Sequence, residues 1–376
     1  MRIDALYVHI PFCLRKCNYC DFASFPLEGH GPLFAAYPDL LARELELWGD
    51  AVDLSRLRTV YFGGGTPSLL ESETIRRLLA LLPPAARIEE CTLEANPETV
   101  DQARLTAFRQ AGANRLSLGV QSFDQGLLRA MGRGHDGERA AAAVSWARQA
   151  GFDNISLDLI YGLPGQTLAQ WRDSLERALA LAPEHISLYG LTIHPDTPWG
   201  RQLAQGSLAA PDEDLAADML ELAMELLPEN GFRQYEIANF AKAGYESRHN
   251  CAYWQRDNYL GLGLSAASCL NDRRLANTAD PDEYAAAVSS GRLPVSEDET
   301  YDIEQVLGEA MFLGLRLLDG VDAEAYRERY GVDPRRRFRA ELKRLEKQGL
   351  IVCEKNHIRL TPRGVALGNL VFGEFV

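Results

Sequence analysis

The chain has 376 residues, enough for one large and one small domain, and its 46% hydrophobic and 24% charged residues are typical of a globular protein without a membrane-spanning segment. A formal net charge of −14 disfavours non-specific binding to nucleic acid or to an anionic membrane, so we expect no nucleic-acid partner and no membrane anchor. Seven cysteines, three clustered and four scattered, together with an N-terminus that has no signal-peptide pattern, favour the reducing cytoplasm as the location.

Strand patterns alternate with helical patterns over the first half of the chain. The expected strands are Ala5–Ile10, Arg58–Phe62, Ile88–Glu94, Arg115–Val120, Asn154–Ile160 and His185–Leu191. The expected helices between them are Leu33–Trp48, Ser72–Leu82, Gln102–Ala111, Glu138–Ala150 and Leu168–Leu181. This alternation predicts an α/β fold with a parallel sheet, and six units are too few for a closed eight-unit barrel. We therefore expect an open, partial (β/α)₆ barrel with its chemistry at the carboxyl ends of the strands.

The second half of the chain is expected to be organised differently. An amphipathic helix is predicted over Asp212–Leu227, and the alternation stops near Thr300. The C-terminal part predicts helices over Ile303–Leu317, Asp322–Tyr330 and Arg335–Gln348, a hairpin over Leu350–Leu360, and a last helix that begins with Thr361 and Pro362. Acidic residues interleave with the basic ones of 335–347, which favours a solvated face over a nucleic-acid surface. We expect a barrel core over 1–230, a connecting segment over 231–300 and a small winged-helix-like α+β domain over 301–376.

A loop with three cysteines directly follows the first strand. Cys13, Cys17 and Cys20 have the spacing C-x₃-C-x₂-C, which lets three thiolates converge on one metal centre. Three soft ligands without an evident fourth fit an iron–sulfur cluster with one open iron. On spacing alone, a zinc site that borrows His9 and three unrelated buried thiols remain alternatives.

The residues around this loop, Tyr7-x-His9-Ile10-Pro11-Phe12-Cys13, resemble the opening of the HemN/HemW branch of radical S-adenosylmethionine proteins. The resemblance implies that the three cysteines hold a 4Fe–4S cluster and that S-adenosylmethionine chelates the open iron. It also implies that reduction of the cluster splits the S–C5′ bond of this cofactor to give a 5′-deoxyadenosyl radical. Tyr7 and Tyr19 are expected near the cofactor by the same resemblance.

Two motifs follow the second and third strands. In Gly63–Pro67, glycines allow the backbone to approach a ligand closely, although the pattern alone is equally typical of a turn. The resemblance implies that Gly64, Gly65 and Thr66 meet the amino end of S-adenosylmethionine. Glu94, in Glu-Ala-Asn-Pro, is by itself a weak signal, and its match to the E-x-N-P motif of the family makes it a predicted cofactor contact.

Polar residues also follow the fourth and fifth strands. Gln121 can hold a carboxylate or an amide, and Arg133 suits bidentate recognition of a carboxylate, although a surface arginine is the commoner case. Asp158 interrupts an apolar strand and so needs a partner, or a polar barrel interior. The resemblance places all three in the S-adenosylmethionine site, and it places a further contact, not assigned to one residue, in Leu191–Thr197.

The stretch Ser247–Trp254 contains His249 beside aromatic residues. Histidine is a common heme-iron ligand and aromatics suit a flat macrocycle, but such a histidine is more often part of a core. The stretch matches the HN-x-x-YW motif of HemW-like proteins, so His249 is the predicted heme contact. Cys251 lies within the motif, where a thiolate ligand is an alternative, but a small buried hydrophobe is the favoured interpretation. The isolated Cys91, Cys269 and Cys353 are interpreted as core residues.

Two functions are consistent with the resemblance. One is a heme chaperone of the HemW type, which binds heme and delivers it to client heme proteins. The other is oxygen-independent coproporphyrinogen III dehydrogenase, which decarboxylates two propionates in porphyrin biosynthesis. The dehydrogenases carry a fourth cysteine two residues after the third, where this chain has Phe22, and an N-terminal extension, where only Met1–Leu6 precede Tyr7. Together with the HN-x-x-YW match, these features favour the chaperone.

The resemblance leaves open whether the protein is also an enzyme. Its expected cofactors are the 4Fe–4S cluster, S-adenosylmethionine and heme, and its expected partners are heme and client heme proteins. A homodimer and a transient association with a membrane are left open as well.

Overall fold

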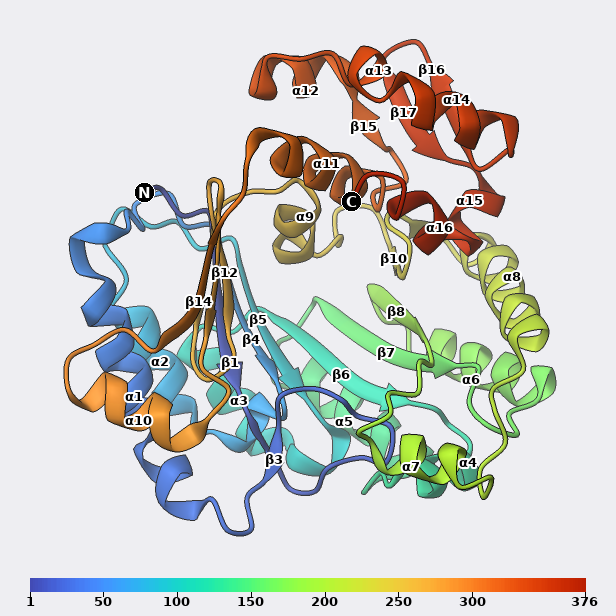
Figure 1. Ribbon diagram of the computed structural model, residues 1–376. Helices are drawn as coiled ribbons and strands as arrows, with labels where there is room; N and C mark the ends of the chain where they lie inside the picture. The colour runs from blue at the N-terminus through green and yellow to red at the C-terminus, as the bar shows by residue number, and fades with distance from the viewer.

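The computed structural model describes all 376 residues, and its largest element is one twelve-stranded sheet. Six parallel strands form the centre of the sheet, in the order β1 (Ala5–Ile10), β4 (Thr59–Gly64), β5 (Glu90–Ala95), β6 (Arg115–Gln121), β7 (Ile155–Tyr161) and β8 (His185–Gly190). All six were expected from the sequence. The sheet curves around an open interior with helices on its outer side (Figure 1), which confirms the partial barrel.

The helices that connect these strands also agree with the sequence patterns. They are α1 (Gly31–Trp48), α2 (Ser72–Ala80), α3 (Gln102–Ala111), α5 (Gly137–Gln149) and α6 (Leu168–Ala180), followed after β8 by α8 (Glu213–Glu229). Two short helices, α4 (Gln125–Met131) and α7 (Pro198–Ala204), were not expected. Aspartate caps explain several of the starts: Asp101 and Asp136 each accept a hydrogen bond from the backbone N–H three residues further on. None of the helices is long and apolar enough to cross a bilayer.

Residues 231–300, expected as a connecting segment, add strands to both edges of the barrel sheet. β11 (Tyr259–Leu262) lies parallel to β1, and β12 (Ala267–Leu270), β13 (Arg273–Asn277) and β14 (Val295–Thr300) continue that edge as an antiparallel meander. At the other edge, β10 (Asn239–Ala241) pairs with β8, and β9 (Arg233–Gln234) pairs with β10. Two helices complete the segment, α9 (Arg248–Trp254) and α10 (Pro281–Ser289).

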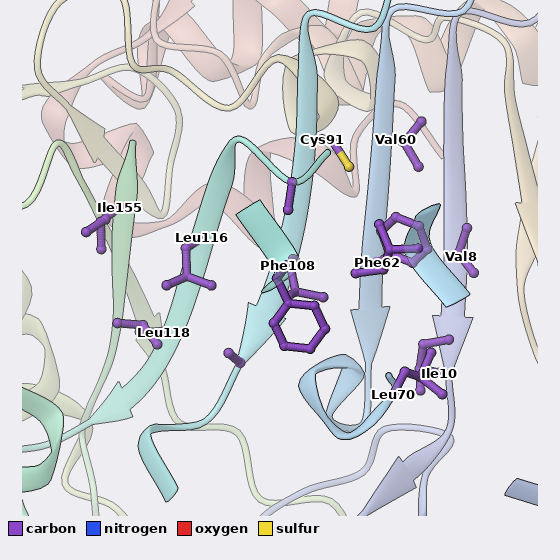
Figure 2. Packing of buried hydrophobic residues seen from close by; sticks show 14 of the residues in the cluster. Val8, Ile10, Val60, Phe62, Leu70, Cys91, Phe108, Leu116, Leu118 and Ile155 are labelled. Carbon is purple, nitrogen blue, oxygen red and sulfur yellow. The ribbon is translucent and has the colours of Figure 1, made fainter. Parts of the chain in front are cut away.

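The parallel strands separate an apolar outer face from a polar interior. Alternate residues of each strand point to opposite faces of a sheet. Those that point outward are buried hydrophobics packed under the helices, and Figure 2 shows Val8, Ile10, Val60, Phe62, Cys91, Leu116, Leu118 and Ile155 among them. Their neighbours in sequence face the interior and include Tyr7, Tyr61, Glu94, Ser117 and Asp158. The interior therefore offers polar groups to a ligand, while the outer layer holds the fold together.

The C-terminal domain has a hydrophobic core of its own, which runs from Leu307 to Phe375. Its elements are α11 (Ile303–Gly314), β15 (Val321–Asp322), α12 (Ala323–Tyr330), α13 (Pro334–Arg337), α14 (Arg339–Lys347), β16 (Ile351–Glu354), β17 (His357–Leu360), α15 (Pro362–Ala366) and α16 (Gly368–Phe372). Helices and a small antiparallel sheet confirm the winged-helix-like α+β prediction. The single helix expected over Arg335–Gln348 is interrupted at Phe338, whose backbone leaves the helical region while its ring is buried.

The C-terminal domain sits at the amino ends of the barrel strands (Figure 1). Backbone hydrogen bonds from Ile237 to Arg316 and from Leu318 to Tyr235 join it to the segment around β9 and β10. The carboxyl ends of the strands, where the cysteine loop follows β1, lie at the opposite end of the barrel. The two ends of the barrel therefore differ: one is covered by the C-terminal domain and the other carries the predicted site.

One buried carboxyl group, Glu44 of α1, makes stability depend on pH. Its side chain accepts hydrogen bonds from Gly263 N–H at 2.8 Å, Tyr284 O–H at 2.7 Å and Asn277 Nδ2 at 2.6 Å. Burial nevertheless raises its pKa to about 7. The folded chain therefore holds the proton of Glu44 more tightly than the unfolded chain does. This difference adds to the free energy of unfolding in full below the unfolded pKa of about 4.5, and the added stability is lost as pH rises to about 7.

We expect Glu44→Gln to remove this pH dependence, because glutamine does not ionise. The free energy of unfolding of the native chain, relative to the variant, should fall by ~3 kcal/mol between pH 4.5 and pH 7.5. Urea unfolding over that range measures it. The control is Glu46→Gln, at an exposed position of the same helix. Parallel stability curves for the native chain and Glu44→Gln would contradict the prediction.

Candidate functional site

A cavity of ≈ 340 Å³ opens at the carboxyl ends of the barrel strands, between these ends and the cysteine loop. Most of the residues predicted as a site line it: Cys13, Cys17, Tyr19, Cys20, Gly64, Gly65, Thr66, Glu94, Gln121, Arg133 and Asp158. They come from β4, β5, β6, β7 and from three loops, so the fold brings together residues that are up to 145 positions apart in the sequence. Tyr7 and His249 do not line the cavity.

Hydrogen bonds connect two of the cysteines through side chains at the ends of β4 and β5. Thr66 donates its hydroxyl to Cys13 Sγ at 3.5 Å and accepts from Asn96 Nδ2 at 3.0 Å. Asn96 Oδ1 in turn accepts from Arg133 Nη2 at 2.6 Å, and Arg133 Nη1 lies 3.6 Å from Cys17 Sγ. The cysteine loop is thus held in place by strand-end residues, as a metal-binding loop requires.

The geometry around the cysteines disfavours the zinc alternative. No three side chains of the Cys, His, Asp and Glu type are close enough together to hold one metal ion. His9 has no free ring nitrogen, because Nδ1 is hydrogen-bonded to Tyr7 O–H at 2.9 Å and Nε2 to the Ala23 carbonyl at 2.8 Å. In an iron–sulfur cluster each thiolate bonds a different iron, so the sulfurs stand further apart than around one ion. Three free cysteines on the wall of one cavity fit such a cluster.

The thiols must lose protons when a cluster binds. Burial raises the pKa of Cys13 and of Cys20, and the neighbouring thiols add to the effect. Since thiolates are the ligands of iron, cluster assembly releases these protons and is favoured at higher pH.

The glycine loop after β4 fits closely around the first cysteines. Gly64 has a φ of +113°, and a Cβ at this position would lie 2.5 Å from the His9 ring. A Cβ on Gly65 would lie 2.7 Å from the Phe12 carbonyl oxygen and 3.0 Å from Cys13 Sγ. A side chain at either position would therefore push the loop away from the cysteines.

Glu94 lies beside this loop, deep in the cavity. It accepts hydrogen bonds from Tyr61 O–H at 2.7 Å and from Gly64 N–H at 3.1 Å. Burial raises its pKa to about 7, and the nearby Asp158 adds to the shift. A ligand ammonium group at this position would favour the ionised carboxylate, so the site is suited to the amino end of an amino acid.

Arg133 and Gln121, which also line the cavity, are suited to an anion. Arg133 is half-buried and donates from Nη2 to the Gly119 carbonyl at 2.6 Å, while its buried Nε has no hydrogen-bond partner. Gln121 adopts the left-handed conformation, φ 66°, which costs energy for a residue other than glycine and is common at functional sites. An unpaired guanidinium N–H beside a strained amide is an arrangement that a bound carboxylate would complete.

Asp158 faces the polar interior, as the sequence predicted. Its carboxylate accepts from the hydroxyl of Ser117 at 2.9 and 3.1 Å and from that of Ser156 at 3.3 Å. Burial raises its pKa, although these hydroxyls act in the other direction. The aspartate is thus held in position and remains available to hydroxyl groups of a ligand.

Tyr7 and His249 lie inside the barrel, outside the lining of the cavity. The Tyr7 hydroxyl is hydrogen-bonded to His9, and its ring lies 6.1 Å from the ring of Tyr61, which binds Glu94. His249 is 1% exposed and stacks on Tyr61, and its ring nitrogens are hydrogen-bonded to Thr59 Oγ1 at 2.9 Å and Tyr253 O–H at 2.8 Å. In this arrangement neither nitrogen is available to an iron ion.

The whole of helix α9, which carries the HN-x-x-YW motif, occupies the amino ends of the strands, opposite the cysteine loop (Figure 1). Glu90, at the start of β5, fixes the first turn of α9. Its carboxylate accepts from the backbone N–H of Arg248 at 2.9 Å and of His249 at 3.0 Å. The motif and the cysteine loop are therefore separate sites on one barrel.

Comparison with known proteins decides the family. Residues 7–178 match the Radical SAM superfamily and residues 301–367 match the HemN C-terminal domain. The heme chaperone HemW of Bacillus subtilis (strain 168) is 37% identical over 378 residues, which cover 100% of this chain and 99% of that protein. The chain belongs to the HemW family of radical SAM proteins. The heme chaperone HemW of Lactococcus lactis is 35% identical, over 99% of this chain and 97% of that protein.

A solved structure of the radical SAM enzyme HemN agrees with this family assignment. Coproporphyrinogen III oxidase (HemN) from Escherichia coli superposes with a TM-score of 0.83 and 25% sequence identity, and covers 100% of this chain and 90% of that one. Radical SAM proteins carry a 4Fe–4S cluster and bind S-adenosylmethionine, so these are cofactors of this HemW-family chain. The cluster, when bound, supplies the electron for reductive cleavage of S-adenosylmethionine.

Sequence reasoning missed three residues of the site in this HemW-family chain. Asn96 is the link between Thr66 and Arg133, and its position in the Glu94–Pro97 motif was the available signal. His194 and Asp21 both line the cavity and pair at 3.1 Å between His194 Nε2 and Asp21 Oδ2. His194 lies in Leu191–Thr197, where a contact was expected without a residue, while nothing in the local sequence pointed to Asp21 as its partner.

Proposed function

We propose that this protein is a heme chaperone, which binds heme and passes it to client heme proteins. The observation that carries the proposal is the end-to-end similarity to proteins named heme chaperone HemW, at 35–37% identity. Phe22 supports it, because it stands at the cavity where the dehydrogenases of the branch have their fourth cysteine. A phenylalanine that is 63% exposed beside a cofactor site favours contact with an apolar ligand or partner.

In this proposal the cavity holds the cluster and S-adenosylmethionine. Cys13, Cys17 and Cys20 hold the cluster. The loop of Gly64, Gly65 and Thr66 receives the amino end of S-adenosylmethionine, together with Glu94. Elsewhere in the cavity, Gln121 and Arg133 receive anionic and amide groups, and Asp158 receives hydroxyl groups. Tyr19 closes the site from the cysteine loop, where its ring packs near Trp199.

The alternative function, oxygen-independent coproporphyrinogen III dehydrogenase, is favoured by the full-length superposition on HemN. Phe22 does not prevent radical chemistry, because three cysteines suffice to hold the cluster. The alternative therefore needs a direct test with substrate. We further propose that the protein acts in the cytoplasm, where its seven free cysteines stay reduced, and that its clients are heme proteins. A homodimer and transient contact with membranes belong to the same proposal.

Titration of the anaerobically reconstituted protein with heme tests the proposal. We expect saturable binding of one heme per chain, followed by the Soret band, and transfer of that heme to an apo heme protein. In a parallel reaction with coproporphyrinogen III, S-adenosylmethionine and a reductant, we expect no protoporphyrinogen IX. Turnover of coproporphyrinogen III without specific heme binding would contradict the chaperone and support the alternative.

A further inference from the structure

The histidines of this chain differ in whether a ring nitrogen is free. The chain has seven histidines. Both ring nitrogens are hydrogen-bonded in four of them, His9, His135, His185 and His249, and all four are buried. Only His30, His194 and His357 keep a nitrogen without a partner, and among these only His194 lines the cysteine cavity. An iron ligand at the cavity therefore has one histidine candidate.

His194 also has the partner that a metal-binding histidine usually has. Its side chain is 47% exposed, and its Nε2 is paired with the carboxylate of Asp21 on the cysteine loop, which leaves Nδ1 as the free ring nitrogen. Donation of one imidazole N–H to a carboxylate fixes the ring orientation and makes the other nitrogen a better ligand. The pair joins the loop after β8 to the loop after β1, so it spans the mouth of the cavity.

The surroundings of this pair suit a flat apolar ring with carboxylate groups. Leu14, Phe22 and Tyr189 line the same cavity and are 51%, 63% and 46% exposed, so this one cavity carries three exposed apolar or aromatic side chains. Heme buries its apolar faces against such side chains. Arg15 lines the cavity as well, and its guanidinium can receive a propionate.

We propose that heme binds across the mouth of the cysteine cavity, with His194 as an axial iron ligand and Asp21 as the residue that positions it. The ring lies on Leu14, Phe22 and Tyr189, on the solvent side of the cluster rather than beside α9. This inference rests on the proposed function, and it names the site where the heme would be held. It also replaces His249 as the expected ligand, because His249 is enclosed at the other end of the barrel.

The test compares heme binding by the full-length, cluster-reconstituted native chain with four variants. We expect His194→Ala to raise the Kd for heme at least ~10-fold and to remove the low-spin histidine signature from the absorption and EPR spectra, with the signature restored by added imidazole. We expect Asp21→Asn to raise the Kd by a smaller factor. His249→Ala should keep the native Kd and spectrum.

The matched control is His357→Ala. His357 is as exposed as His194, at 48%, and faces the carboxylate of Asp322 at 3.7 Å, but it lies in the C-terminal domain. Cluster absorbance equal to that of the native chain shows that each variant is folded. Native heme affinity and spectrum in His194→Ala, or an equal loss in His357→Ala, would overturn the site while leaving the chaperone in place. Absence of specific heme binding by the native chain would overturn the proposed function, and this site with it.

Discussion

Cys17→Ala is expected to leave the protein without a stable 4Fe–4S cluster. Three thiolates line the cavity, and no fourth cysteine can replace a lost one. Cys91 and Cys269 are buried outside the cavity, Cys251 belongs to α9 at the other end of the barrel, and Cys353 is exposed in the C-terminal domain. Removal of Cys17 also takes away the sulfur that Arg133 contacts.

The measurement is iron and acid-labile sulfide per chain after anaerobic reconstitution, together with the visible absorbance of the cluster. We expect both to fall to a small fraction of the native values. Cys353→Ala is the control, because it removes an exposed thiol far from the cavity and should retain a full cluster. A cluster of normal stoichiometry in Cys17→Ala would show that the loop does not supply the ligands assigned to it.

The same variant separates the cluster from the heme. If heme lies on Leu14, Phe22 and Tyr189 with iron on His194, then Cys17→Ala should still bind heme, with a lower affinity because the loop that carries Leu14 and Phe22 has lost one of its contacts with the barrel. Arg133, Asn96 and Thr66 tie that loop to the strand ends only through Cys13 and Cys17. Heme binding by the cluster-free Cys17→Ala chain would therefore show that residues at the mouth of the cavity, and not the cluster, hold the heme.

The barrel could be predicted from sequence because its signals are local. Each parallel strand is an apolar run between turn residues, and each site motif directly follows such a run, so the carboxyl ends of the strands collect the motifs. Asp158 is an example: an acid inside an apolar strand correctly indicated a polar interior. The three cysteines are equally local, since one short loop contains them all.

The remaining features depend on long-range pairing that no local pattern encodes. β14 has the sequence Val-Ser-Glu-Asp-Glu-Thr and is mostly exposed, so it is not apolar enough to be identified as a strand. It forms because β13 pairs with it and Arg273 contacts Asp298. The position of α9 also depends on long-range contacts. Its HN-x-x-YW motif predicts a ligand site, but His249 is hydrogen-bonded to Glu90 and Thr59, which lie more than 150 residues earlier in the sequence. These bonds hold the helix at the amino ends of the barrel strands.

One largely buried acid, Glu309 of α11, lies at the junction between the barrel and the C-terminal domain. Its carboxylate accepts from Arg256 Nε at 2.7 Å and from Arg274 Nε at 3.0 Å, and all three side chains are at most 17% exposed. Both arginines belong to the barrel part of the chain, one after α9 and one on β13. Nearby, the Arg316 guanidinium lies 4.2 Å from the centre of the Trp254 ring and completes the contact between the parts.

We expect Glu309→Ala to destabilise the protein by ~3–5 kcal/mol, because it leaves two buried guanidinium groups without a counter-charge. Urea unfolding followed by tryptophan fluorescence measures the change, and limited proteolysis between the two parts should become faster, since docking of the C-terminal domain is weakened. Glu304→Ala is the control on the same helix: Glu304 pairs with Arg337 at the surface, where such a pair contributes ~0–1 kcal/mol. Equal stability losses in the two variants would show that the buried cluster does not hold the domains together. A selective loss in Glu309→Ala would show that this ion-pair cluster fastens the C-terminal domain next to the HN-x-x-YW helix.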